Sequence, residues 1–208
     1  MAGREYEIIV VNDGSNDRTV DVVLGLEDNK IRVVNNPGNK GKGFAVRNGM
    51  LNARGNVLLF SDADLSTPIS ELDNFLPLLE RGYDVVFGSR AMKHSNIEVH
   101  QPRSRELMGK LYNKIVRATT ISGIKDTQCG FKLFTKDAAN KIFNLQKLDG
   151  FSFDVEILYL AKKCGFQIKE VPVTWINNPD TKINSVKDSA KMFVDLLKIR
   201  WLHERKKI

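Results

Sequence analysis

The chain has 208 residues, 42% of them hydrophobic, and a formal net charge of +7. This length suits one domain with a substantial core, and the positive charge favours anionic partners: nucleotides, phosphorylated lipids, nucleic acid or a membrane surface. No apolar stretch reaches the ~18 residues of a membrane-spanning helix, no signal peptide is visible, and the only two cysteines exclude a disulfide framework, so we expect a soluble or peripheral protein facing a reducing compartment.

The first half of the chain predicts strands that alternate with helices. Short apolar runs predict buried strands, and apolar residues at helical spacing predict helices. The expected strands cover residues 6–12, 31–34, 57–60 and 83–87; the expected helices run to residue 24 and cover residues 44–53 and 68–80. This alternation predicts an α/β fold, with a mostly parallel central sheet and helices on both faces.

The second half is less regular. A polar loop is expected over 91–102, an extended piece over 126–134, a strand over 167–175, and helices over 104–121, 136–143, 153–164 and 185–202. Pro172 favours an edge position for the last strand, because proline has no N–H to donate. We expect a domain over 1–180, with halves 1–103 and 104–180, followed by a basic amphipathic helix over 181–208. The three histidines lack metal-ligand spacing and are expected at the surface: His94, His100 and His203.

Charged residues follow three of the expected strands directly. Asp13 follows the first strand, Asp62 and Asp64 follow the third, and Arg90 follows the fourth. The carboxyl ends of parallel strands share one edge of a sheet, where open α/β sheets bind ligands. Paired carboxylates there suit a divalent cation on a diphosphate, and arginine suits phosphate. Taken alone, the aspartates are better explained as turn or capping residues and the arginine as half of a surface ion pair, so the combination predicts the site.

A glycine-rich basic loop, residues 35–43 (NNPGNKGKG), precedes the second helix. Its glycines and its two lysines, Lys40 and Lys42, would let the backbone approach a nucleotide. The loop lacks the Gly-Lys-Ser/Thr ending of a phosphate loop, however, and a flexible solvated loop explains it equally well.

Six segments, taken in order, carry a resemblance to a known family: residues 13–15 (DGS), 39–49 (NKGKGFAVRNG), 62–64 (DAD), 88–90 (GSR), 126–134 (DTQCGFKLF) and 153–156 (FDVE). Together they resemble the family 2 glycosyltransferases with the GT-A fold. The last two segments are similar to the dolichyl-phosphate beta-glucosyltransferase branch, whose sister branch is dolichyl-phosphate mannose synthase.

The resemblance implies an inverting hexosyltransferase that uses Mg²⁺ or Mn²⁺. UDP-glucose is the favoured donor, GDP-mannose the alternative, and dolichyl or another polyprenyl phosphate the acceptor. The residues implied to contact the nucleotide sugar are Asp13, Lys42, Asp62 and Arg90, and the implied metal ligands are Asp62 and Asp64. The implied catalytic residues are Asp64, Arg105 and Asp126. The implied contacts of the acceptor are Gln128 and Glu156. The acceptor phosphate is already anionic at pH 7, so a general base is dispensable. If a base exists, Asp126 and Glu156 are the first candidates; the structural alternatives are that Asp126 caps a turn and that Glu156 pairs with a lysine.

Family members begin with an earlier strand that grips the nucleobase, and this sequence starts at the strand that follows it. We therefore expect an N-terminally truncated fold with two unpaired strand edges. Two alternatives follow: an inactive or partner-dependent relative that binds nucleotide sugar weakly, and a family 2 transferase with a different acceptor. A sugar-nucleotide pyrophosphorylase would need a glycine-rich N-terminal signature. Nucleic acid is not an expected partner, because the lysines are not interleaved with aromatic residues.

The expected helix over 185–202 combines apolar residues with lysines and ends near Trp201. An apolar face, basic flanks and an aromatic anchor are typical of an interfacial helix. A helix packed on the domain with a solvated lysine face explains the pattern equally well. With a lipid acceptor implied, we expect the chain to be peripheral to the cytoplasmic face of a membrane.

Overall fold

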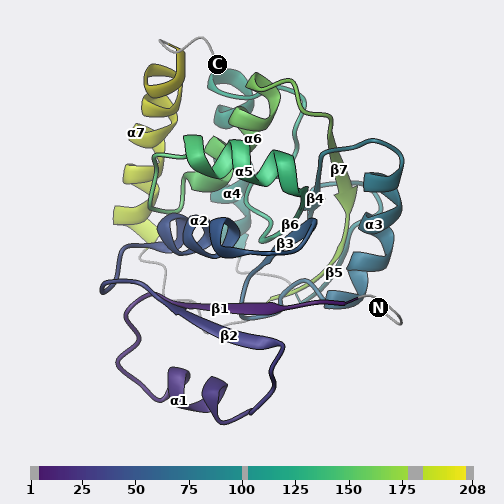
Figure 1. Ribbon diagram of the computed structural model, residues 1–208. Coiled ribbons are helices and arrows are strands. Elements are labelled where there is room, and N and C mark those ends of the chain that lie inside the picture. The colour runs from purple at the N-terminus through teal and green to yellow at the C-terminus, as the bar shows by residue number, and fades with distance from the viewer. Residues whose placement is uncertain (1–4, 100–102, 178–184, 205–208) are drawn as a thin grey trace.

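The structure is a computed structural model that describes residues 5–99, 103–177 and 185–204 (Figure 1). In chain order the elements are β1 (Ile8–Asn12), α1 (Thr19–Leu24), β2 (Ile31–Asn35), α2 (Lys42–Asn52), β3 (Val57–Ser61), a 3₁₀ turn (Ile69–Glu71), α3 (Leu72–Glu80), β4 (Val85–Ser89), β5 (Asn96–Val99), α4 (Arg103–Thr119), β6 (Phe131–Thr135), α5 (Lys136–Leu145), α6 (Phe153–Lys163), β7 (Ile168–Pro172), β8 (Thr174–Ile176) and α7 (Ser185–Glu204). Strand β5 was not predicted, since its sequence is that of a polar loop. The strand expected over 167–175 is divided into β7 and β8.

The largest sheet has four strands in the order β3-β6-β4-β7. Strand β6 runs antiparallel to both β3 and β4, whereas β4 and β7 are parallel, so β3, β4 and β7 share one direction. The carboxyl ends of β3 and β4 therefore lie at the same edge, next to the start of β6, where Ser61 pairs with Phe131. Pro172 ends β7 at the outer edge of this sheet, as predicted.

Strands β1 and β2 form a separate parallel pair, and β5 and β8 form another. Among the described strands, β1 pairs only with β2 and β3 pairs only with β6, so each keeps one unpaired edge. Helix α2 packs against both β1 and α5 and so connects the small pair to the main body (Figure 1).

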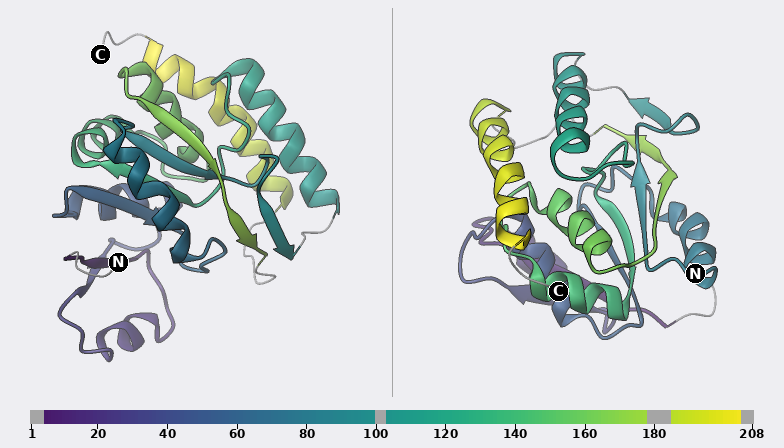
Figure 2. Two further views of the ribbon diagram at one scale, coloured as in Figure 1. Left: turned by 90° about the vertical axis from the view of Figure 1, so that its right-hand side faces the viewer. Right: turned by 90° about the horizontal axis from the view of Figure 1, so that it is seen from above.

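Both faces of the four-stranded sheet are covered, because β4 is apolar on both sides. Val85 and Phe87 point into a core built with α4, α5, α6 and α7, while Val86 points into a second core built with α3. This alternation follows from the two-residue period of a strand. Figure 2 shows α3 and the other helices on opposite sides of the strands.

Helix α7 is packed on the domain by one face and exposed on another. Leu196 and Ile199 are buried in the larger core, whereas Val194, Leu197 and Trp201 are exposed. The pattern is thus that of a packed helix which keeps an apolar stripe at the surface. No helix in the described part of the chain is both long and apolar enough to cross a bilayer.

The prediction that His203 lies at the surface is wrong. Its exposed fraction is 3%, and its Nε2 lies 2.7 Å from Glu156 Oε1 of α6. The last turn of α7 faces α6, a long-range contact that the local helical pattern could not predict. His94 is exposed as expected, and His100 lies outside the described residues.

Candidate functional site

Asp62 follows β3 directly and is held from two sides. Its backbone N–H donates to the Gly130 carbonyl oxygen at 2.9 Å, and its Oδ1 lies 2.8 Å from Lys42 Nζ. Lys42 is the first residue of α2, so the glycine-rich loop brings its ammonium group to the end of β3. The structure thus brings together two of the predicted nucleotide-sugar residues.

Asp64 lies two residues further along the same loop and is exposed. Its Oδ1 accepts a hydrogen bond from the Ser66 N–H at 3.0 Å. Between them, Leu65 has a φ of +51°, which is uncommon for a residue other than glycine. Such a backbone costs free energy and persists only where its surroundings impose it, so the turn that presents Asp64 is a constrained one.

Behind Asp62 lies a buried ion pair that the sequence analysis missed. Lys132, in the middle of β6, is fully buried and pairs with Asp154 of α6; its Nζ also donates to the Cys129 carbonyl oxygen at 2.6 Å. Burial raises the pKa of Asp154, an effect that the ammonium groups of Lys132 and Lys42 oppose. The sign in the sequence is a lysine inside an apolar strand, FKLFT, because a buried lysine requires a carboxylate partner.

The ring of Phe60 lies near both lysines. The ammonium nitrogen of Lys42 lies 5.6 Å from the centroid of this ring, and that of Lys132 lies 5.7 Å from it. Both distances are within the range of cation–π attraction. Asp62, Lys42, Asp154 and Lys132 thus form a cluster of alternating charge around one aromatic ring, and we refer to these four residues as the Asp62 cluster.

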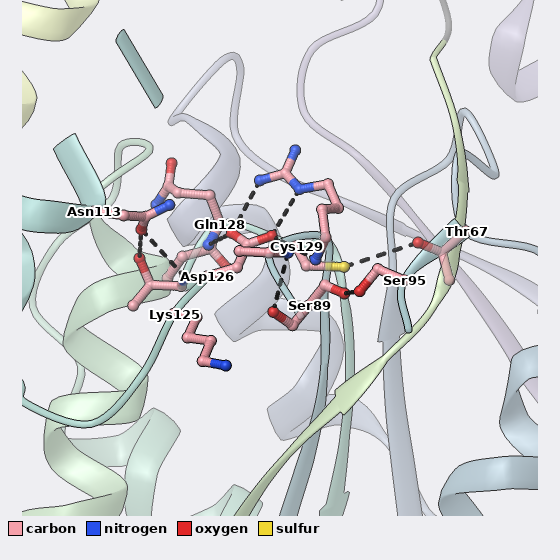
Figure 3. A network of polar contacts seen from close by, with 12 residues as sticks. Thr67, Ser89, Ser95, Asn113, Lys125, Asp126, Gln128 and Cys129 are labelled. Carbon is pink, nitrogen blue, oxygen red and sulfur yellow. Dashed lines mark hydrogen bonds and ion pairs between the residues drawn. The ribbon is translucent and has the colours of Figure 1, made fainter. Parts of the chain in front are cut away.

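Arg90 follows β4 and is bound by Asp126, which Figure 3 labels within its network of polar contacts. Its Nε lies 2.7 Å from Asp126 Oδ2, and its Nη2 lies 3.0 Å from Oδ1. The N–H groups of Arg90 and Gln128 also donate to this carboxylate. Asp126 is buried, while the Arg90 side chain keeps an exposed fraction of 26% and stacks on Trp175. The arrangement fixes the orientation of the guanidinium group at the sheet edge.

The Arg90–Asp126 pair predicts how stability falls in acid. Burial alone would raise the pKa of Asp126, but Arg90 and the N–H donors outweigh it and lower the pKa from 3.8 to about 2. Because the folded-state pKa is depressed, this stabilisation is complete above about pH 4 and is lost as the pH falls towards 2. We expect urea unfolding to show the largest difference between the wild type and Asp126→Asn above pH 4, with the difference shrinking by pH 2. An unchanged difference across this range would contradict the assignment.

Asp13 follows β1 and braces the glycine-rich loop. Its carboxylate accepts from Asn36 Nδ2 at 2.8 Å and from the N–H groups of Lys40 and Gly41 at 2.9 and 2.8 Å. Burial opposes ionisation, but these donors lower the pKa of Asp13. Gly41 has a φ of +102°, and a Cβ there would lie 2.6 Å from the Asp149 carbonyl oxygen, so this glycine is required by the packing of the loop.

The three other candidates differ in what the structure gives them. Gln128 lies two residues after Asp126, and its Nε2 is buried without a hydrogen-bond partner among the described residues. Glu156 is fully buried, and its oxygens accept from the N–H groups of Lys147 and Leu148 at 2.9 and 2.8 Å as well as contacting His203. Arg105 lies in α4, but its side chain falls outside the described part of the chain.

The glycosyl transferase family 2 model matches residues 2–143 of the sequence. The chain belongs to this family. The match spans β1 to α5 and therefore includes Asp13, the Asp62 cluster except Asp154, and the Arg90–Asp126 pair.

Curated family 2 relatives extend the similarity over almost the whole chain. A dolichyl-phosphate beta-glucosyltransferase of Trichomonas vaginalis is 38% identical over 201 residues, covering 93% of this chain and 61% of the relative. The enzyme of that name from Drosophila melanogaster is 38% identical over 204 residues, with 93% and 63% covered. The one from Saccharomyces cerevisiae is 36% identical over 217 residues, with 95% and 65% covered. The chain therefore spans about three fifths of the length of these relatives.

Solved structures confirm the fold of this family 2 chain. Glucosyl-3-phosphoglycerate synthase from Mycobacterium tuberculosis, in complex with phosphoglyceric acid, superposes with a TM-score of 0.71 at 18% identity and covers 93% of this chain and 68% of that one. Its complex with Mn²⁺, UDP and glucosyl-3-phosphoglycerate gives a TM-score of 0.70 at 19% identity, with 93% and 68% covered. The expected GT-A fold class is thereby confirmed.

The residues at the sheet edge fit a divalent ion that is shared with a ligand. No group of three or more His, Cys, Asp or Glu side chains gathers as a metal site within the described residues. Asp62 and Asp64 supply two carboxylates, and Asp62 Oδ1 already holds a cation, the Lys42 ammonium group. Mg²⁺ is commonly held by one or two carboxylates together with substrate phosphates, which is the donor set that this edge provides.

Proposed function

We propose that this chain catalyses inverting transfer of glucose from UDP-glucose to dolichyl phosphate or a similar polyprenyl phosphate. The observation that carries the proposal is the approach of Lys42 to Asp62, next to Asp64, at the carboxyl edge of β3. The two carboxylates, whose oxygens are hard ligands, thus lie beside an ammonium group at the edge where α/β sheets bind nucleotides. The similarity to dolichyl-phosphate beta-glucosyltransferases supports the choice of sugar and lipid.

The nucleotide sugar would lie along the sheet edge. Asp13 and the loop that it braces would contact the nucleobase, and Asp62 would face the ribose or the metal. Mg²⁺ or Mn²⁺ held by Asp62 and Asp64 would neutralise charge on the leaving diphosphate. Lys42 would add a second positive charge on the same side. Arg90, whose Nη1 is not used by Asp126, would bind a phosphate of the donor or the acceptor.

Transfer needs no general base in this proposal. An oxygen of the acceptor phosphate is already anionic and attacks the anomeric carbon, while the bond from that carbon to the diphosphate oxygen breaks. Asp126 would then act through Arg90, because its carboxylate is ionised and already accepts four hydrogen bonds, three from Arg90 and one from the Gln128 N–H. Gln128 and Arg105 remain proposed contacts of the acceptor and its phosphate. Glu156 stays a proposed acceptor contact that would require its present partners to be exchanged.

We propose further that α4 and α7 face a membrane surface where the lipid acceptor resides. Leu107, Met108 and Leu111 are exposed on α4, and Leu197 has an exposed fraction of 68% on α7. Lysines and arginines lie beside them, and the net charge of +7 favours anionic lipid headgroups.

The test is a transfer assay with the 208-residue chain. It is incubated with Mg²⁺ or Mn²⁺, dolichyl phosphate, and labelled UDP-glucose or GDP-mannose, and the lipid fraction is counted. We expect label in the lipid from UDP-glucose. Lipid label from GDP-mannose alone would move the proposal to the sister branch, and no lipid label from either donor would favour the inactive or partner-dependent relative.

Gly130 provides a sharp test of the position of Asp62. A Cβ at Gly130 would overlap the Asp62 carboxylate, so Gly130→Ala must push that side chain out of its present place. We expect transfer to fall by on the order of tenfold or more, since small displacements at a reacting centre are costly. Gly25→Ala is the control, because Gly25 ends α1, outside both the site and α4, and its φ of −68° is one that alanine adopts. The nearest atom to a Cβ there is the Asp21 carbonyl oxygen at 3.2 Å. Equal activity of the two variants would contradict the role of Asp62.

A further inference from the structure

We propose that Lys42 is an internal counter-ion which must leave Asp62 before a divalent cation can bind, so that metal and diphosphate bind together rather than separately. The inference rests on the proposed function in one respect, the assignment of the metal to Asp62 and Asp64. It goes beyond that function by assigning a regulatory role to Lys42.

One carboxylate oxygen of Asp62 is already occupied by Lys42. Lys42 Nζ lies 2.8 Å from Asp62 Oδ1, and both side chains are about 30% exposed, at 29% and 30%. A metal ion ligated by this oxygen would stand within a few ångströms of the ammonium group if Lys42 stayed in place. Two cations so close repel each other strongly where water is partly excluded. Lys42 and the metal therefore exclude one another at Asp62.

Of the two partners, Lys42 is able to move and Asp62 is not. Asp62 is tied through its N–H to the Gly130 carbonyl oxygen, and its carboxylate lies against Gly130 where no Cβ would fit. Lys42 has four rotatable side-chain bonds and an exposed path. Displacement of the lysine thus leaves the carboxylate in position for a metal.

The net charge of the site also favours joint binding of metal and diphosphate. Asp62, Asp64 and Asp154 carry three negative charges, and Lys42 and Lys132 carry two positive ones, so the site has one net negative charge. A divalent cation alone would reverse this to one net positive charge in a partly buried place. A nucleoside diphosphate sugar brings about two negative charges from its two phosphates and restores the original balance. The site therefore favours metal and diphosphate as a pair.

The diphosphate also gives the released lysine a new partner. Lys42 begins α2, and its ammonium group lies over the ring of Phe60 at the same edge as Asp62. A phosphate bound to a metal at Asp62 would be within reach of this group, so the ion pair lost with Asp62 is replaced by one with the ligand. Metal bound alone offers no such replacement.

The experiment measures Mn²⁺ binding to the 208-residue chain by the loss of the electron paramagnetic resonance of free Mn²⁺, with and without UDP. We expect the wild type to bind Mn²⁺ at least about tenfold more tightly when UDP is present. Lys42→Met should bind Mn²⁺ alone about tenfold more tightly than the wild type and should gain less from UDP. Lys141→Met is the charge control, since it removes an exposed lysine from the middle of α5, outside the glycine-rich loop.

Three results would overturn the inference. Lys42→Met could bind Mn²⁺ alone no more tightly than the wild type; Lys141→Met could show the same gain, which would make the effect one of net charge; or neither the wild type nor Lys42→Met could bind Mn²⁺ with UDP present. Circular dichroism checks that each variant is folded. The readout does not depend on sugar transfer, so failure of the lipid assay with normal Mn²⁺ binding would refute the proposed acceptor and leave this inference standing.

Discussion

Replacing Asp64 with asparagine should lower the rate of sugar transfer by about 100-fold to 1000-fold. The substitution removes one of the two negatively charged groups that we propose as metal ligands, and loss of one group that stabilises charge in a transition state costs this much in other enzymes. Asp64 is exposed, and its carboxylate accepts a local hydrogen bond from the Ser66 N–H, so folding should be unaffected. The measurement is label transferred to dolichyl phosphate per unit time at saturating UDP-glucose and Mn²⁺.

Asp137→Asn is the control for Asp64→Asn, because it removes an exposed carboxylate from the first turn of α5, which begins at the opposite edge of the sheet, where Thr135 pairs with Val57 at the start of β3. It should transfer sugar at the rate of the wild type. If Asp64→Asn retained more than about a tenth of that rate, the metal would not depend on Asp64 in the way that the geometry indicates.

Methionine in place of Lys132 should lower the free energy of unfolding by about 3–5 kcal/mol, because it leaves the Asp154 carboxylate buried without its partner. Lys132 is fully buried, and Asp154 has an exposed fraction of 2%. Urea unfolding followed by fluorescence measures the change. The double variant Lys132→Met/Asp154→Asn should recover a large part of the loss, since neither side chain then carries a charge.

A loss below about 1 kcal/mol for Lys132→Met would contradict the charged pair, as would a double variant less stable than the single one. The same experiment bears on the site. The Asp154 carboxylate interacts electrostatically with the ammonium groups of both Lys132 and Lys42. Loss of the Lys132–Asp154 pair should therefore also weaken the electrostatic stabilisation of the Lys42 ammonium group.

The order of elements could be predicted because it is local. Apolar runs and helical spacing are properties of neighbouring residues, and they gave β1, β3, β4 and most helices to within a few residues. The strand-end rule then predicted that Asp62, Asp64 and Arg90 would share an edge, since β3 and β4 run in one direction. The family resemblance supplied the metal and the donor, which spacing alone could not.

The remaining features depend on contacts between distant parts of the chain. The sequence does not reveal that β6 inserts antiparallel between β3 and β4, and this pairing is what brings Gly130 against Asp62 and Lys132 behind it. The glycine-rich loop was expected to be either a nucleotide cradle or a solvated loop, yet Gly41 is packed against the backbone of Asp149. The prediction that His203 is exposed was wrong for the same reason, because its partner, Glu156, lies on another helix.

The central claim is that the carboxyl edge of β3 and β4 is a metal-dependent site for a nucleoside diphosphate. Calorimetric titration of the 208-residue chain with UDP tests this claim most directly. With Mn²⁺ present, we expect UDP to bind the wild type, and we expect its affinity to fall at least about tenfold when EDTA replaces Mn²⁺ or when Asp64 is asparagine. Equal binding of UDP with Mn²⁺ and with EDTA, or equal binding by Asp64→Asn, would contradict the account.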